Sequence, residues 1–162
     1  MAIGAEERKK AKVKAGRYCA MGERSSKQVL QKLLAYGMSL TEAEQIVAEL
    51  IQDRFVDDLR FSRAFANDKF RFNKWGRRRI ALEMKMKHGL AEEQIAAGLE
   101  VIEENEYQAM IESLLNRKWQ SLSEDLSQIV RKKRTVEFLV RKGFESDLAY
   151  AALDQIVSRT EH

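Results

Sequence analysis

The sequence predicts an all-α protein, an elongated and curved array of tandem three-helix repeats in which the third copy is truncated and one further helix precedes the first copy. Three observations favour this class. The chain has no proline and only eight glycines, so most of it can run as helix without an interior breaker. Three glycines recur 52 and 54 residues apart. The segments around them repeat the same helical spacing of apolar residues.

The first helix of each copy is expected to end at one of these glycines, Gly37, Gly89 or Gly143. Helices commonly end on a residue with left-handed backbone, which glycine adopts without strain. We expect an i, i+4 pair of apolar residues on one helix face before each glycine: Leu30 and Leu34, Leu82 and Met86, Val136 and Val140. The residues after the glycines should fold back on the same helices, so that Met38 meets Leu33, Leu90 meets Met84 and Phe144 meets Leu139.

The second helix of each copy carries one apolar stripe, formed by Ala43, Val47 and Leu50, by Ile95, Leu99 and Ile102, and by Ala149, Leu153 and Ile156. A third helix follows over 107–119 in the second copy. In the first copy its counterpart opens at Asp57 and Asp58, since acidic residues suit a helix N-terminus. The chain reaches His162 before a third helix of the third copy can form. Each three-helix unit buries little apolar surface alone and must pack against its neighbours to be stable.

These patterns predict one continuous repeat domain with four segments. Residues 1–21 form an N-terminal helix that packs on repeat 1, and the three repeats span 22–73, 74–122 and 123–162. Ser25 with Gln28 and Ser39 with Glu42 have the spacing of capping boxes at two helix starts.

Composition excludes several classes of protein. With 44% hydrophobic and 33% charged residues, the chain is too apolar to be disordered and too interrupted by charge to span a membrane. The basic start, Met1 to Lys14, has no apolar segment behind it and does not resemble a secretory signal. Cys19 is the only cysteine, so we expect it to be a buried apolar residue rather than a member of a disulfide or thiolate metal site. A cytoplasmic monomer is expected.

Catalytic motifs are missing from the sequence. It holds no phosphate loop, dinucleotide fingerprint, zinc-protease pair or nucleophile elbow. His88 and His162 stand 74 residues apart, and His88 precedes a cap glycine, where it can interact with the helix end. Asp57 and Asp58 are adjacent and so do not face each other on a helix, which favours a capping role. We therefore predict no enzyme activity, catalytic residue, metal or cofactor. An enzyme using Asp57, Asp58 and a metal is the weakest alternative.

Positive charge is concentrated in the middle of the chain, where 60–87 contains ten Lys or Arg and two acidic residues. Cations alternate with Phe70, Phe72 and Trp75 here, as in sites that contact phosphates and stack on bases. The predicted binding residues are Lys69, Arg71, Lys74, Arg77, Arg78, Arg79, Lys85 and Lys87, with a second cluster of Arg131, Lys132, Lys133 and Arg134. The alternative is a solvated helix surface with its aromatics turned into the core.

Several motifs resemble the bacterial RecX family. The stretch 55–61, Phe-Val-Asp-Asp-Leu-Arg-Phe, the stretch 75–80, Trp-Gly-Arg-Arg-Arg-Ile, and Glu83 to Gly89 are similar to the family's central signature. Arg24 to Leu34 resembles its first helix and 138–144 its last repeat, so the resemblance runs from Arg17 to Ile156. The chain departs from the family pattern at Val29, Leu33, Arg54, Ser62 and Met84. At Arg54 and Ser62 the family commonly has a small residue and alanine.

The resemblance implies a regulator of the RecA recombinase, binding in the groove of the RecA filament on single-stranded DNA and usually restraining strand exchange or the ATP cycle. Recombination, DNA repair and the SOS response would then be the processes it modulates. The implied partners are the RecA nucleoprotein filament and single-stranded DNA, with double-stranded DNA left open. An alternative is a DNA-binding helical repeat protein that acts independently of RecA.

Overall fold

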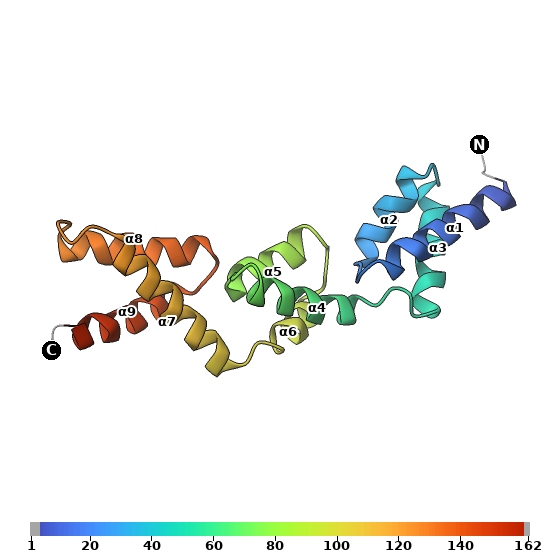
Figure 1. Ribbon diagram of the computed structural model, residues 1–162. Helices are drawn as coiled ribbons and strands as arrows, with labels where there is room; N and C mark the ends of the chain where they lie inside the picture. The colour runs from blue at the N-terminus through green and yellow to red at the C-terminus, as the bar shows by residue number, and fades with distance from the viewer. Residues whose placement is uncertain (1–3, 161–162) are drawn as a thin grey trace. The chain divides into compact units, whose positions relative to one another are not determined.

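The computed structural model describes residues 4–160, which form α-helices and no strand (Figure 1). The helices are α1 (Ala5–Ala20), α2 (Ser26–Ala35), α3 (Leu40–Gln52), α4 (Asp58–Arg71), α5 (Arg77–Met86), α6 (Glu92–Leu99), α7 (Glu104–Ser121), α8 (Gln128–Arg141) and α9 (Ser146–Thr160). The prediction of an all-α fold is confirmed. His162 lies outside the described residues.

The chain divides into two compact units. The first comprises Met1–Phe65 and Met84–Gly98, and the second comprises Ala66–Glu83 and Leu99–His162. Helices α4 and α5 therefore each contribute residues to both units.

Helices α1, α2 and α3 pack together in the first unit (Figure 1). The buried residues of α1 are small, Ala11 and Ala15, and allow its backbone to approach α2 closely, while Tyr18 and Cys19 pack against the core partly buried. Helices α2 and α3 supply Val29, Leu33, Ala43, Ile46, Val47 and Leu50, and the segments that follow these helices add Met38 and Val56. The predicted apolar stripe of α3 is thereby confirmed in this copy.

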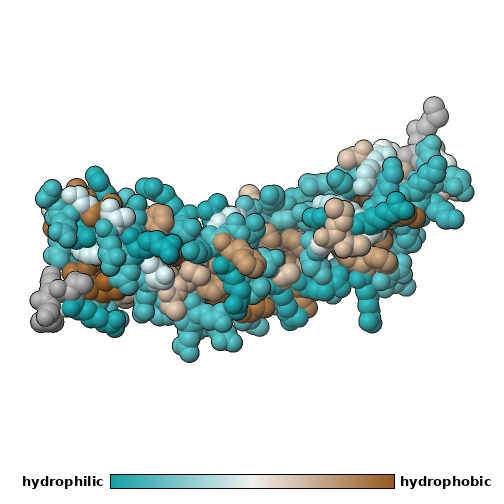
Figure 2. Space-filling model, in the orientation of Figure 1, coloured by the Kyte–Doolittle hydropathy of each residue, from teal (hydrophilic) through white to brown (hydrophobic). Residues whose placement is uncertain are grey.

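Helix α7 is the central element of the second unit and contacts both α8 and α9 (Figure 1). Its buried residues recur at helical spacing and are Tyr107, Ile111, Leu114, Leu115 and Trp119. α8 adds Val136 and Leu139, and α9 adds Ala149, Leu153 and Ile156. Hydrophilic side chains cover most of the visible face of the molecule, and apolar ones reach the surface in separate patches (Figure 2).

The three repeated glycines all adopt left-handed backbone, with φ of 92° at Gly37, 63° at Gly89 and 100° at Gly143. After α2, the N–H of Met38 donates to the carbonyl of Leu33 over 3.2 Å, and after α8 the N–H of Phe144 donates to Leu139 over 3.1 Å. This is the Schellman pattern of a helix end. Each folded-back residue is buried, as the sequence predicts.

The apolar pairs predicted for the first helix do not mark its buried face in the first two copies, whereas in the third copy Val136 is buried and Val140 is exposed. Four members of the predicted pairs are exposed, namely Leu34, Leu82, Met86 and Val140. The buried positions lie one residue nearer the N-terminus at Val29 and Leu33, and two residues nearer at Ile80 and Met84. The glycine turn explains this, because the residue after it packs on the third-last helical residue and so turns that side of the helix inward. The second copy also has one more residue between helix and glycine.

Polar side chains cap the helix starts. Ser25 and Gln28 form the complete capping box of α2, and Ser39 accepts from the N–H of Glu42 over 3.2 Å. The carboxylate of Asp58 lies at the start of α4 but caps α2, accepting from the N–H of Ser26 over 2.7 Å and from its hydroxyl over 2.6 Å. Asp57 instead accepts from the N–H of Arg60, within its own helix start, over 3.0 Å.

Arg54 ends α3 in the same left-handed geometry, with φ of 63°. The N–H of Phe55 and that of Val56 then donate to the carbonyl of Leu50 over 2.9 and 3.2 Å. A residue with a side chain is strained in this geometry by about 1–2 kcal/mol relative to glycine. Arg54 therefore keeps this turn at a cost in stability.

We expect Gly37→Ala to destabilise the protein by about 1–2 kcal/mol, because the substitution forces a side chain into left-handed backbone. An added Cβ at Gly37 would meet no atom within 4 Å, so the loss reports backbone strain alone. Arg54→Gly should stabilise the protein by up to about 1 kcal/mol, because glycine relieves the backbone strain of the folded state. The gain is small because glycine also adds conformational freedom to the unfolded chain. Urea unfolding of both variants measures this, and an unchanged midpoint for Gly37→Ala would contradict it.

Candidate nucleic-acid interface

The turn between α4 and α5 brings an aromatic ring between two cations in the second unit. Lys74 has left-handed backbone, with φ of 57°, and the N–H of Trp75 donates back to the carbonyl of Lys69 over 3.0 Å. The indole of Trp75 then lies 4.8 Å from the Lys69 ammonium and 4.0 Å from the guanidinium carbon of Arg79, measured to the ring centroid. Both separations are those of cation–π contacts.

Two glycine backbones pack directly against each other beside this turn. The N–H of Gly76 donates to the carbonyl of Lys142 over 2.8 Å, and that of Arg78 donates to the carbonyl of Gly143 over 3.0 Å. A Cβ added at Gly76 would lie 2.3 Å from the Gly143 carbonyl carbon, and one added at Gly143 would lie 2.4 Å from the Cβ of Arg79. Neither position accepts a side chain without moving backbone.

This contact places Lys142, at the end of α8, beside the α4–α5 turn. Its ammonium donates to the carbonyl of Asn73 over 3.4 Å. Burial lowers the pKa of Lys142, and the charges of Arg79 and Lys74 lower it further. The shift indicates three cations close enough to repel one another. We call Lys69, Lys74, Trp75, Arg79 and Lys142 the Trp75 cluster.

The Trp75 cluster is positively charged, with little compensation from within the chain. Among residues 4–160, no carboxylate forms an ion pair with Lys74, Arg79 or Lys142. Cations held together without an acidic partner create a potential that attracts anions. A phosphate group would relieve their mutual repulsion, and the adjoining aromatic residues suit nucleotide bases.

The three aromatic residues of the basic run lie in different environments. Phe70 is buried, with its ring centroid 5.9 Å from that of Tyr107. Trp75 is half-buried under its cations. Phe72 is 78% exposed, so its ring is the one available for stacking. The alternative of aromatics turned into the core therefore holds for Phe70 alone.

Arg77 differs from its neighbours because its guanidinium binds within the chain. It pairs with Glu104 over 2.6 Å and with Glu145 over 3.0 Å, and it lies 3.9 Å from the ring centroid of Tyr107. The Tyr107 hydroxyl accepts from the Arg77 N–H and donates to Glu145. Burial, and then this bond to Glu145, raises the pKa of Tyr107. The network ties the start of α5 to α7 and to the residue before α9.

The remaining predicted residues on α4 and α5 are exposed. Arg71 pairs with Glu106 over 2.9 Å. The side chain of Arg78 has no hydrogen bond or ion pair in the described portion of the chain. Lys85 and Lys87 are exposed at the end of α5 and just beyond it.

The second predicted cluster, on α8, is partly used internally. Arg131 lies 3.9 Å from the ring centroid of Trp119 and donates to the Trp119 carbonyl over 3.2 and 2.7 Å. Lys132 pairs with Asp154 over 3.4 Å. Lys133 and Arg134 are exposed. Only two of these four cations therefore face solvent without an internal partner in the described structure.

His88 is a core residue in the first unit rather than a surface residue at a helix end. It is buried, its Nδ1 lies 2.9 Å from the hydroxyl of Ser25, and its ring centroid lies 4.7 Å from that of Phe61 and 5.2 Å from that of Phe65.

Within 4–160, no group of three or more His, Cys, Asp or Glu is arranged to hold a metal ion. Cys19 is partly buried, and burial raises its pKa. None of the helices described in this range is both long and apolar enough to cross a bilayer.

Tandem helical units and a cationic, aromatic surface define a helical repeat protein suited to an anionic partner. Comparison with known families narrows this class. Residues 57–99 match the family model described as RecX, second three-helix domain, and residues 104–153 match RecX, third three-helix domain. The two matches cover more than half of the chain, which therefore belongs to the RecX family.

Curated relatives agree with this assignment. Regulatory protein RecX of Stenotrophomonas maltophilia (strain R551-3) is 30% identical over 127 residues, which cover 77% of this chain and 74% of the relative. Regulatory protein RecX of Leuconostoc mesenteroides is 23% identical over 135 residues, covering 83% of this chain and 50% of the relative. The chain thus spans about half the length of that relative and of the one from Oceanobacillus iheyensis.

Solved structures show the same fold. The crystal structure of RecX from Lactobacillus salivarius superimposes with a TM-score of 0.83 at 18% identity, covering 94% of this chain and 97% of that one. A second crystal structure, of a regulatory protein RecX, superimposes with a TM-score of 0.83 at 17% identity, covering 93% of this chain and 73% of that one.

The family models and the glycine spacing divide the chain into three-helix repeats at different points. The models begin a unit just before α4 and another at α7, whereas the predicted repeats 22–73, 74–122 and 123–162 begin before α2, α5 and α8. Counted from α7, the last unit has three helices, and counted from α8 it has two. The division into these repeats and an N-terminal segment, residues 1–21, stays a prediction.

We expect Arg77→Ala to destabilise the protein by about 1–3 kcal/mol, because it leaves Glu104 and Glu145 without their shared cation and removes the guanidinium from the face of Tyr107. Arg78→Ala removes the same charge from the adjacent position, where the side chain makes no internal bond, and should leave stability within about 0.5 kcal/mol of the parent. Chemical unfolding compares the two variants. Equal losses would contradict the structural role of Arg77.

The raised pKa of Tyr107 makes stability depend on pH in the alkaline range. The unfolded tyrosine ionises near its ordinary pKa of about 10, while the folded one holds its proton to higher pH. The stabilisation is therefore complete below a pH of about 10 and is lost as pH rises toward the folded pKa. We expect unfolding free energy to fall more steeply above a pH of about 10 in the parent protein than in Tyr107→Phe. If the free energy of unfolding falls with pH at the same rate in both proteins, the prediction is contradicted.

Proposed function

We propose that this chain regulates the RecA recombinase by binding in the groove of the RecA filament on single-stranded DNA, where it hinders strand exchange or ATP hydrolysis. It would thereby modulate recombination, DNA repair and the SOS response as a cytoplasmic, non-catalytic, monomeric protein. Membership of a family whose relatives are named regulatory proteins supports a regulatory role. The Trp75 cluster is the observation that carries the nucleic-acid component of the proposal.

The proposed DNA contact uses the cations that the chain does not pair internally. Arg79 lies over the Trp75 ring and is close enough to Lys142 to lower its pKa, as is Lys74, and all three cations suit phosphate oxygens because they donate hydrogen bonds and carry charge. The exposed ring of Phe72 offers a surface for one base. Such contacts read charge and stacking rather than sequence, as a protein acting along a filament on any DNA requires. Arg78, Lys133 and Arg134 would add contacts.

Arg77 is left out of this surface, although it belongs to the predicted run of three arginines. Its guanidinium is shared between two glutamates and the face of Tyr107. Withdrawing it for a phosphate would leave both carboxylates unpaired. Its contribution to binding is therefore indirect, through the position of the turn that carries Arg79.

We expect the triple variant Lys74→Ala, Arg79→Ala, Lys142→Ala to lose most of its effect on the DNA-dependent ATPase activity of RecA, because it removes three phosphate contacts. In fluorescence anisotropy on single-stranded DNA, the slope of log affinity against log salt should fall by about 2. The control variant Arg63→Ala, Arg117→Ala, Arg159→Ala removes equal charge from exposed positions elsewhere and should keep the ATPase effect. If both variants lose the ATPase effect equally, the effect depends on net charge and not on the Trp75 cluster, which would contradict the proposed contact.

The alternative function is DNA binding without the recombinase. The same anisotropy assay distinguishes it when bare and RecA-coated single strands are compared. Tighter binding to the coated strand supports the RecA partner. Equal affinity for both, with no change in RecA's ATPase rate, favours the alternative.

A further inference from the structure

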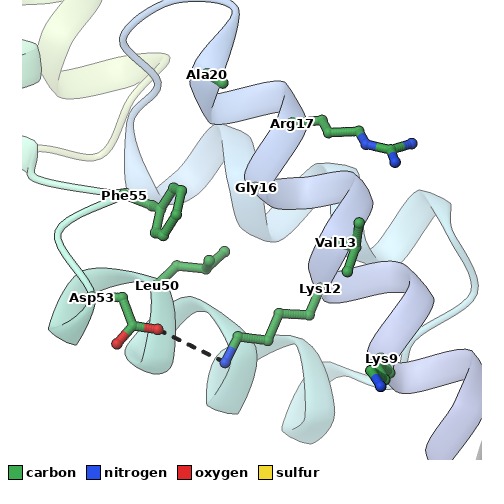
Figure 3. Close-up of a pocket in the computed structure, with 9 residues that line it drawn as sticks. All are labelled: Lys9, Lys12, Val13, Gly16, Arg17, Ala20, Leu50, Asp53 and Phe55. Atoms are coloured by element: carbon green, nitrogen blue, oxygen red, sulfur yellow. Dashed lines mark ion pairs between the residues drawn. The ribbon is translucent and has the colours of Figure 1, made fainter.

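The first unit has an apolar pocket that the proposed DNA contact does not use. It has a volume of about 600 Å³ and lies between α1 and the end of α3. We call it the α1 pocket, and the residues that line it are Lys9, Lys12, Val13, Gly16, Arg17, Ala20, Leu50, Asp53 and Phe55. In Figure 3, Lys12 reaches from α1 toward Asp53, Phe55 stands over Leu50, and Arg17 extends away from the pocket. Pockets of this size hold one or two large side chains or a small ligand.

A strained turn presents an aromatic ring to this pocket. The left-handed backbone of Arg54 reverses the chain after α3, so that Val56 enters the core while Phe55 stays 50% exposed. Val13, on α1, is also about half exposed at 48%. Large apolar side chains left open around a concave site are typical of binding surfaces. Phe55 and Val13 therefore form apolar walls with no partner in the described structure that covers them.

Gly16 supports the same interpretation, because its position has no use in the packing of the unit. It lies inside α1, where glycine costs about 1 kcal/mol relative to alanine. A Cβ added there would meet no atom within 4 Å. Close packing thus does not require this glycine, and its absent side chain widens the pocket.

The charges around the pocket favour an acidic ligand. Lys12 is neutralised internally, since it pairs with Glu49 over 3.1 Å and with Asp53 over 3.9 Å. Lys9 and Arg17 are exposed and have no ion pair among residues 4–160. They lie eight residues apart on α1, or about 12 Å along the axis at 1.5 Å per residue, with Val13 midway. A second hollow along α1 shares Lys9, Val13 and Arg17.

We propose that the α1 pocket docks an acidic helical segment of a partner protein. One large apolar side chain of that segment would enter between Val13 and Phe55. Carboxylates one turn to either side would meet Lys9 and Arg17, whose exposed side chain would turn toward the pocket from the direction that it takes in Figure 3. The apolar walls favour a peptide over a nucleic-acid backbone, which would have to leave its phosphates beside them without water. The inference does not rest on the proposed DNA contact, which lies in the other unit.

The test uses a fluorescein-labelled 13-residue helical peptide of alanine and glutamine, with phenylalanine at its centre and glutamate four residues to either side. We expect saturable binding to the full chain by anisotropy, at least tenfold tighter than for peptides with lysine in place of glutamate or serine in place of phenylalanine. Gly16→Leu fills the pocket and should weaken binding at least tenfold. Gly16→Ala is the matched control, since it also favours helix but stays small, and should bind within twofold of the parent.

Charge reversal gives a second measurement that does not depend on filling the pocket. Lys9→Glu with Arg17→Glu should invert the preference, so that the lysine peptide binds more tightly than the glutamate peptide. No saturable binding, or equal binding by the parent protein of acidic and basic peptides, would overturn the proposal. So would tight binding that Gly16→Leu leaves unchanged, or self-association of the chain that the pocket variants abolish. None of these outcomes depends on the Trp75 cluster, whose variants should bind the acidic peptide normally.

Discussion

The contact of Gly76 with Gly143 holds together the surface on which the nucleic-acid proposal depends. Gly143 meets two demands at once, because it ends α8 in left-handed geometry and also leaves room for the backbone of α5. The carbonyls of Lys142 and Gly143 accept hydrogen bonds from the N–H groups of Gly76 and Arg78, so the end of one helix supplies acceptors for the start of another. Lys142 lies close to the other cations of the Trp75 cluster only because the two glycine backbones approach each other so closely.

Sequence reasoning predicted the helical units well because their signals are local. A glycine that ends a helix and an apolar stripe at 3.6-residue spacing are set by neighbours within one or two turns. The predicted caps at Gly37 and Ser25 and the stripe of α7 are of this kind. The exposed position of Leu34 shows the limit of spacing alone. Two faces one residue apart both contain apolar side chains, and the turn decides between them.

The site was less predictable, because its cations are sorted by residues far away in the sequence. Arg77, Arg78 and Arg79 look equivalent in the sequence, yet only Arg77 meets Glu104 and Glu145. Lys142 was missed, since nothing near Gly143 indicates that a turn 69 residues earlier lies beside it. Its position next to a cap glycine marks a helix end but does not reveal which segment packs there. A charge count identifies a basic region, but the acidic partners supplied by the fold determine which charges remain.

The bond from Asp58 to Ser26 has a consequence for dissecting the chain into fragments. The second three-helix domain of the family begins at residue 57, so a cut at that boundary looks natural. It would separate α2 from the carboxylate that accepts from its first N–H and from the Ser26 hydroxyl. An excised first domain would therefore lose a helix cap that belongs, by sequence, to its neighbour. The boundary drawn from sequence similarity thus cuts through a compact unit of this structure, which runs on to Phe65 and includes Met84–Gly98.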